Sequence, residues 1–134
     1  MVAKVSESTE TQQAAICVVE SDSRERDALL QLLRRLGQEI VAFESAEALL
    51  EALDRTPMKV LIAGLELDGL SGLDLLHELR HRGRPVPSIL LARQSDVATA
   101  VGAIRAGALD FIQKPVIDRI LLRRVRDALE QAEA

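Results

Sequence analysis

Short apolar runs alternate with amphipathic segments along most of this chain, and this alternation limits the folds open to it. The runs are four to six residues long and cover 16–19, 40–43, 58–63, 89–92 and 109–112. Between them, apolar residues recur at spacings of three and four, which is typical of helices with one buried face. Runs that are apolar throughout belong to strands covered on both sides. The pattern predicts an α/β protein with a doubly wound, five-stranded parallel sheet and helices on both faces.

The first 13 residues lack this pattern. From Ser6 to Gln13 the chain contains only Ser, Thr, Glu and Gln, and such a segment buries too little apolar surface to hold a structure. We expect residues 1–13 to form a disordered leader and residues 14–134 to form one domain. No apolar run reaches the roughly 20 residues that span a bilayer, and the leader has no signal-peptide core. We therefore expect a cytoplasmic protein without a membrane segment.

Charge and aromatic content argue against direct nucleic-acid binding. The formal net charge is −4, aromatic residues make up 1% of the chain, and the basic residues form no block. Phosphate backbones attract clustered Lys and Arg, and single-stranded bases stack on aromatic rings. The only cysteine, Cys17, excludes an internal disulfide and is predicted to be a small core residue.

Charged residues follow three of the predicted strands. In parallel α/β sheets, ligands bind beyond the carboxyl ends of the strands. Glu20 follows the first strand and Lys114 follows the fifth. Glu66 and Asp68 lie in the loop after the third. Because Mg²⁺ prefers carboxylates and lysine neutralises phosphoryl charge, these residues fit a cation and phosphate site. They fit equally well as solvated loop residues and a surface lysine.

Three stretches of the sequence resemble a known family. They are I-C-V-V-E-S-D at 16–22, G-L-S-G-L-D-L-L at 69–76 and D-V-A-T-A-V-G-A-I-R-A-G-A-L-D-F-I-Q-K-P at 96–115. On these stretches the chain resembles the receiver domain of two-component response regulators, which implies a flavodoxin-like (βα)5 fold. In that family an acidic pair after the first strand binds Mg²⁺, and an aspartate ending the third accepts a phosphoryl group from a histidine kinase. A Ser or Thr after the fourth strand and a Lys after the fifth contact that group.

The resemblance implies that this phosphorylation site is degenerate. Lys114 matches the family, but the acidic pair falls on Glu20 and Ser21. The phosphoacceptor falls on Gly64 and the Ser or Thr on Ala92. Glycine has no carboxylate to attack phosphorus, and alanine has no hydroxyl to contact a phosphoryl oxygen. We expect a pseudo-receiver that is not an enzyme, with no catalytic residue, no metal ligand set, no cofactor and weak or absent Mg²⁺ binding.

The same resemblance implies a protein-interaction face. Receivers contact partners through the fourth helix, the fifth strand and the fifth helix, and an aromatic in that strand rotates with activation. The aromatic position is Phe111, and the face includes the charged residues Arg105, Asp110, Arg119 and Arg123. The partner implied is an output domain, a kinase or a second copy of the chain, so a homodimer is one expected form.

The sequence leaves two alternative functions open, and it also contains one motif that is typical of a different chemistry. Glu66 or Asp68 could replace the missing phosphoacceptor in a working site with Mg²⁺, although neither ends the third strand. A small molecule could instead occupy space vacated at Gly64 and Ala92. Residues 77–81 spell H-E-x-x-H, a zinc-protease motif. Because the chain has no third histidine, we interpret this motif as the solvated face of a helix.

Overall fold

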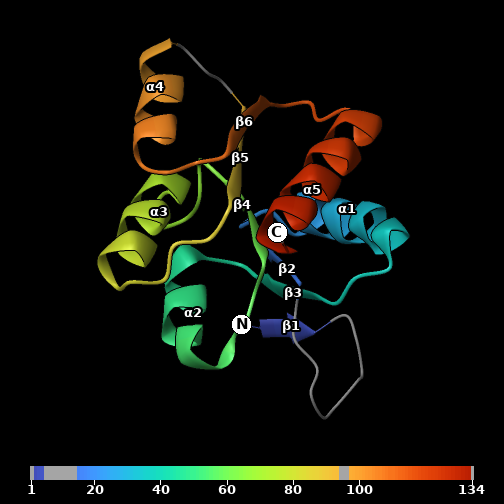
Figure 1. The fold of residues 1–134 in the computed structure, drawn as a ribbon, viewed down its shortest axis with the longest axis horizontal. Helices are drawn as coiled ribbons and strands as arrows, with labels where there is room; N and C mark the ends of the chain where they lie inside the picture. The colour runs from blue at the N-terminus through green and yellow to red at the C-terminus, as the bar shows by residue number, and fades with distance from the viewer. Residues whose placement is uncertain (1, 5–14, 94–96, 134) are drawn as a thin grey trace.

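Five parallel strands form the centre of the protein, as predicted. The computed structural model describes residues 2–4, 15–93 and 97–133. Within them, the parallel strands stand in the order β3-β2-β4-β5-β6 (Figure 1). They are β2 (Ile16–Val19), β3 (Ile40–Phe43), β4 (Val60–Gly64), β5 (Ser88–Ala92) and β6 (Asp110–Gln113). Because the strands are parallel, their carboxyl ends all lie at one edge of the sheet.

A further strand, β1 (Val2–Lys4), pairs antiparallel with the outer edge of β3. The expectation of a disordered leader is therefore wrong for these residues, while residues 5–14 lie outside the described part of the chain. The physical reason is that β3 would otherwise expose a row of unpaired backbone groups. Backbone hydrogen bonds satisfy these groups whatever the apolar pattern of the added strand, so periodicity gave no signal for it.

Helices cover both faces of the sheet, which confirms the predicted layers. Helices α1 (Ser23–Leu33) and α5 (Asp118–Glu133) lie on one face, and α2 (Ala46–Glu51), α3 (Gly72–His81) and α4 (Val97–Arg105) lie on the other (Figure 1). Short 3-10 turns, η1 (Arg34–Leu36) and η2 (Leu53–Arg55), follow α1 and α2. None of the helices in the described residues is long and apolar enough to cross a membrane.

N-cap side chains fix the residue at which α1, α2 and α3 each begin. Asp22 accepts hydrogen bonds from two backbone N–H groups of α1 and is its N-cap. Ser45 caps α2 in the same way. Ser71 and Asp74 form a capping box at the start of α3. Each such cap stabilises its helix by about 1 kcal/mol.

Alternate residues of the strands fill two separate cores. Val18 belongs to the cluster under α1 and α5, whereas Cys17 and Val19 belong to the cluster under α2, α3 and α4. Burial of Cys17 confirms its predicted role as a core residue and raises the pKa of its thiol. Each fully buried Leu or Ile in these clusters contributes about 2 kcal/mol from its removal from water.

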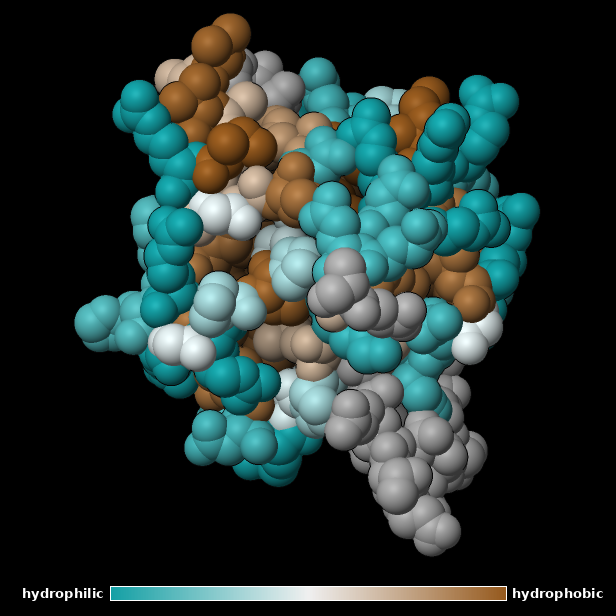
Figure 2. Space-filling view, viewed as in Figure 1, coloured by the Kyte–Doolittle hydropathy of each residue, from teal (hydrophilic) through white to brown (hydrophobic). Residues whose placement is uncertain are grey.

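Helix α4 differs from the other helices because its large apolar side chains face outward. Val97 is 80% exposed, Ile104 53% and Val101 42%. The buried residue of α4 is Ala103, a small residue that packs against the second core. Figure 2 shows the resulting apolar surface over α4.

Candidate functional site

Four of the predicted site positions meet at the carboxyl edge of the sheet. Gly64 ends β4 and Ala92 ends β5, while Glu20 and Lys114 directly follow β2 and β6. The Lys114 backbone N–H donates to the Ala92 carbonyl over 2.6 Å. Its side-chain Nζ donates to Glu20 Oε1 over 3.1 Å. The structure thus brings together residues that lie up to 94 positions apart in the chain.

Glu20 is a buried carboxylate whose hydrogen bonds are all made within the protein. Its side chain is 2% exposed, and Lys114 is 13% exposed. Oε1 accepts from Lys114, and Oε2 accepts from the Asp22 backbone N–H over 3.1 Å. A buried charge of this kind persists only when it is paired and hydrogen-bonded. The Glu20–Lys114 pair is therefore a structural element of this edge of the sheet.

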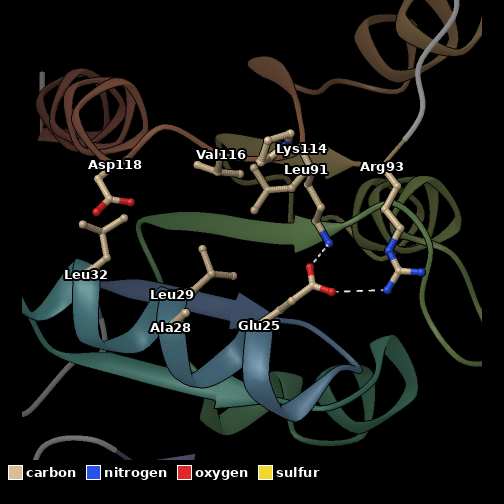
Figure 3. A pocket seen from close by; sticks show the side chains of 10 residues that line it. Glu25, Ala28, Leu29, Leu32, Leu91, Arg93, Lys114, Val116 and Asp118 are labelled. Atoms are coloured by element: carbon tan, nitrogen blue, oxygen red, sulfur yellow. Dashed lines mark hydrogen bonds and ion pairs between the residues drawn. The ribbon is translucent and has the colours of Figure 1, made fainter.

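Glu25, which the sequence analysis did not single out, is the second carboxylate on Lys114. Its Oε1 accepts from Lys114 Nζ over 2.5 Å, and its Oε2 accepts from Arg93 Nη2 over 3.2 Å (Figure 3). Arg93 was also missed, although it directly follows Ala92. The available signal was position: Glu25 lies in the first turn of α1, and that end of α1 meets the carboxyl edge.

These ion pairs shift the ionisation of all three groups. The hydrogen bond from Lys114 lowers the pKa of Glu25 below its ordinary value. Burial lowers the pKa of Lys114, but the hydrogen bonds to Glu25 and Glu20 outweigh it and raise that pKa overall. The pKa of Arg93 is raised by its hydrogen bond to Glu25. At neutral pH, Lys114 is therefore a cation and Glu25 an anion.

Two neighbouring side chains pack close to the backbone of Gly64. A Cβ at this position would approach Glu20 Oε1 to 3.0 Å and Leu67 Cδ2 to 3.3 Å. Glu20 and Leu67 therefore occupy the position where a Gly64 side chain would lie, and whether a small molecule binds near Gly64 and Ala92 stays a prediction. Gly72 at the start of α3 is equally restricted, since a Cβ there would lie 2.3 Å from the Gly64 carbonyl oxygen.

Ser21 and Asp22, which follow Glu20, form hydrogen bonds that fix the loop after β2. Ser21 Oγ donates to the Glu44 carbonyl over 2.9 Å and accepts from the Asp68 backbone N–H over 2.9 Å. Asp22 caps α1, and hydrogen bonds from the backbone N–H groups of Glu25 and Arg24 lower its pKa. Both side chains thus have structural roles in the loop after β2.

Glu66 and Asp68 lie in the loop beyond β4, and both are exposed. Glu66 Oε1 accepts from the Arg93 backbone N–H over 3.2 Å. The two acids border an open cavity of about 390 Å³, which Glu20, Asp22 and Arg93 also line. Among the described residues, no three His, Cys, Asp or Glu side chains are grouped so that they could hold a metal ion.

The predicted interaction face lies on the opposite side of β6 from this cluster of ion pairs. Phe111 is half-buried and packs against the second core. Asp110 is paired with Arg124, while Arg105, Arg119 and Arg123 are exposed. The apolar residues of α4 continue onto this face through Leu109, which is 40% exposed. The charged residues of this face were predicted from the sequence, but its exposed apolar residues were not.

The H-E-x-x-H motif lies on the outer side of α3, as interpreted from the sequence. His77 and His81 are exposed, and Glu78 forms an ion pair with Arg82 over 3.1 Å. The buried side of the helix carries Leu75 and Leu79. The motif therefore faces away from both cores and away from the carboxyl edge.

Comparison with known proteins identifies the family. Residues 16–126 match the response regulator receiver domain. This chain belongs to that family. Over 123 residues it is 32% identical to the transcriptional regulatory protein FixJ of Bradyrhizobium diazoefficiens, covering 92% of this chain and 60% of FixJ. Nodulation protein W of the same organism is 37% identical over 88% of this chain and 52% of its own length.

Solved receiver structures have the same fold. A response regulator receiver protein from Pseudoalteromonas atlantica superimposes with a TM-score of 0.81 at 35% identity, covering 88% of this chain and 98% of that one. The FixJ N-terminal structure gives 0.80 at 32% identity, covering 90% and 96%. This chain spans 52–60% of the length of the curated relatives named above. It is thus a receiver domain of two-component signalling, and the matches describe that domain only.

Proposed function

We propose that this receiver domain signals through protein contacts without being phosphorylated, as a cytoplasmic pseudo-receiver with no enzymatic activity. The observation that carries this proposal is the pairing of Lys114 with both Glu20 and Glu25 beside a glycine at the end of β4. A lysine that contacts a phosphoryl group must have charge available to it. Here two carboxylates of the chain already pair with Lys114, so a phosphoryl group would have to displace one of them.

The chemistry of phosphoryl transfer also lacks its nucleophile at this position. An aspartyl phosphate forms when a carboxylate oxygen attacks phosphorus and the bond to the donor breaks. Gly64 offers no such oxygen, and Ala92 offers no hydroxyl. The neighbouring Ser21 oxygen is engaged with Glu44 and Asp68, so it is not placed to complete a Mg²⁺ site.

The proposed partner surface is the face formed by α4, β6 and α5. It combines the outward apolar residues of α4 with the charged residues Arg105, Asp110, Arg119 and Arg123. Apolar centres with charged rims are the usual composition of protein interfaces. We expect this face to bind an output domain, a kinase or a second copy of the chain. Nucleic acid is not expected to bind the domain directly.

The test is to incubate the chain with Mg²⁺ and acetyl phosphate and to measure its intact mass. We expect no added phosphoryl group. A fluorescent or calorimetric titration with Mg²⁺ should likewise show weak or no binding. A phosphorylated species that is labile to base would contradict the proposal, because it would show an acyl phosphate on some other acid.

A second candidate function is phosphotransfer through a displaced acceptor. The cavity lined by Glu66, Asp68, Asp22 and Arg93 favours it, because it gathers acids and a cation beyond β4. Under this reading, Glu66→Gln or Asp68→Asn would abolish phosphorylation seen with acetyl phosphate. Glu51→Gln on the exposed side of α2 is the matched control, since it removes a carboxylate remote from this loop.

A further inference from the structure

A second cavity lies on the α1 side of the ion pairs, and the proposed signalling role does not use it. It has a volume of about 510 Å³ and lies between α1 and the segment that joins β6 to α5. Figure 3 shows apolar side chains along it, from α1 on one side and from β5 and the segment that joins β6 to α5 on the other. They are Ala28, Leu29, Leu32, Leu91, Pro115 and Val116. A cavity of this size and lining is within the range of small-molecule sites.

One end of the cavity already holds a carboxylate. Lys114 and Arg93, from the ends of two neighbouring strands, both donate to the carboxylate of Glu25 (Figure 3). The Glu25 side chain is 34% exposed, so it can turn toward water without leaving a buried charge behind. Asp118 lines the other end, away from both cations (Figure 3). The cavity therefore has a cationic end, an apolar middle and an anionic end.

We propose that this cavity binds a small monocarboxylic acid with an apolar body. Its carboxylate takes the position of the Glu25 carboxylate between Lys114 and Arg93, and its apolar body covers Ala28, Pro115 and Val116, the apolar lining residues that are not buried. Charge-assisted hydrogen bonds at one end supply direction, and removal of apolar surface from water supplies most of the affinity. Asp118 repels a carboxylate at the far end, so the ligand enters in one orientation.

Other ligand classes fit the same surface less well. An inorganic phosphate would satisfy Lys114 and Arg93 but would leave the apolar middle in contact with water. A cationic ligand would meet Glu25, whose charge two cations already neutralise. A neutral apolar molecule would use the middle of the cavity but gain nothing from either cation. The two cations at one end and the apolar middle of the cavity together favour an amphipathic anion.

Glu25 acts as a built-in competitor in this arrangement. A ligand that binds must first displace it, which breaks the link that joins α1 to the ends of β5 and β6. Glu25→Gln keeps the shape of the side chain but removes the competing charge. We expect it to tighten binding of a carboxylate, whereas loss of Arg93 should weaken it.

The experiment is a titration of the ¹⁵N-labelled chain with octanoate, followed through its backbone amide shifts. The matched probe is 1-octanol, which has the same tail without the charge. We expect octanoate to shift the amides of Leu29, Leu91 and Val116 and to bind more tightly than 1-octanol. Arg93→Gln should weaken octanoate binding by roughly 2- to 5-fold, and Glu25→Gln should tighten it by a similar factor, as expected for an exposed charge pair.

Matched variants distinguish octanoate binding in the cavity from unfolding of the domain and from non-specific binding of octanoate to its surface. Arg123→Gln removes an exposed cation remote from the cavity and should leave octanoate binding unchanged. Ala28→Trp fills the cavity and should abolish binding, whereas Gln31→Trp on the exposed side of α1 should not. The proposal is overturned if octanoate causes no shifts at millimolar concentration, if 1-octanol binds equally well, if Arg93→Gln has no effect, or if the shifts centre on Val101 and Ile104.

Discussion

The two surfaces beside β6 differ in how their polar and apolar groups are arranged. At the carboxyl edge, charges are inside: Glu20 and Lys114 are largely buried and paired with each other. On α4, apolar side chains are outside: Val97, Val101 and Ile104 are exposed and belong to neither core. A protein stabilises its own fold by satisfying buried charges, whereas exposed apolar groups lower its free energy only when a partner covers them.

This difference suggests how the two surfaces divide their roles. At the carboxyl edge, Lys114 is paired with carboxylates of the chain itself. The α4 face keeps the composition of a surface that binds protein. Substitutions should therefore affect folding stability at the edge and partner binding on α4, and each prediction below tests one side of that contrast.

The largest effect on stability is expected from removing the cation at the edge. Lys114→Met leaves Glu20 buried without its charged partner, and breaking such a pair typically costs about 3 kcal/mol. Urea unfolding monitored by circular dichroism measures the loss. The matched variant Glu20→Gln combined with Lys114→Met removes both charges and should recover much of the stability. Equal stability of Lys114→Met and the unmodified chain would mean that the pair has no structural role.

A smaller loss is expected when a side chain is introduced at the end of β4. Gly64→Ala places a methyl group 3.0 Å from Glu20 Oε1, so the buried carboxylate must shift. Overpacking of this kind costs about 1 kcal/mol or more. In a Glu20→Ala background the same substitution should cost less, because the obstructing carboxylate is gone. A cost that does not depend on residue 20 would contradict the close packing of these two positions.

Most of the fold could be predicted from the sequence because apolar periodicity reflects which faces are buried. The meeting of Glu20 and Lys114 was also predictable, since both follow strands whose carboxyl ends share an edge. Glu25 was not, because a charged residue in a first helical turn looks like any solvated one. Its role depends on how α1 is oriented over the sheet, which periodicity does not report.

The exposure of the large apolar side chains of α4 could not be predicted from the sequence, for a related reason. Residues such as Val101 and Ile104 recur at helical spacing whether they face a core or a partner. Only packing shows that the smaller Ala103 contacts the sheet instead. Strand β1 gave no signal either, because its pairing with β3 uses backbone groups.

A still smaller effect is expected from Glu25, and it should depend on pH. The pKa of Glu25 is lowered in the folded protein, so its stabilisation is present above its ordinary value of 4.5 and is lost as pH falls through the folded pKa. The pKa of Lys114 is raised, so the pair persists up to its ordinary value of 10.5 and is lost as pH rises further.

Glu25→Gln should therefore lower stability by about 0.5 kcal/mol near neutral pH, after allowance for solvent screening of a partly exposed pair. Chemical unfolding across this pH range gives the measurement. The difference from the unmodified chain should begin to shrink below about pH 4.5 and should vanish only when the pH has fallen below the lowered pKa of Glu25. Glu51→Gln, on an exposed part of α2, is the control for loss of one carboxylate. A difference that stays constant down to low pH would mean that ionisation of Glu25 does not contribute.

The smallest effect on stability is expected on α4, where the effect on binding should be greatest. Val101→Ser with Ile104→Ser changes side chains that are 42% and 53% exposed, and exposed substitutions usually change stability by less than about 0.5 kcal/mol. The same pair should abolish self-association in analytical ultracentrifugation, or capture of a partner that the unmodified domain binds. Ala128→Ser in the core under α5 is the opposite control, because it should lower stability and leave the face intact. If the α4 variants unfolded the domain, or left every protein contact unchanged, the exposed apolar surface would have a different purpose, and the contrast between the two surfaces would fail.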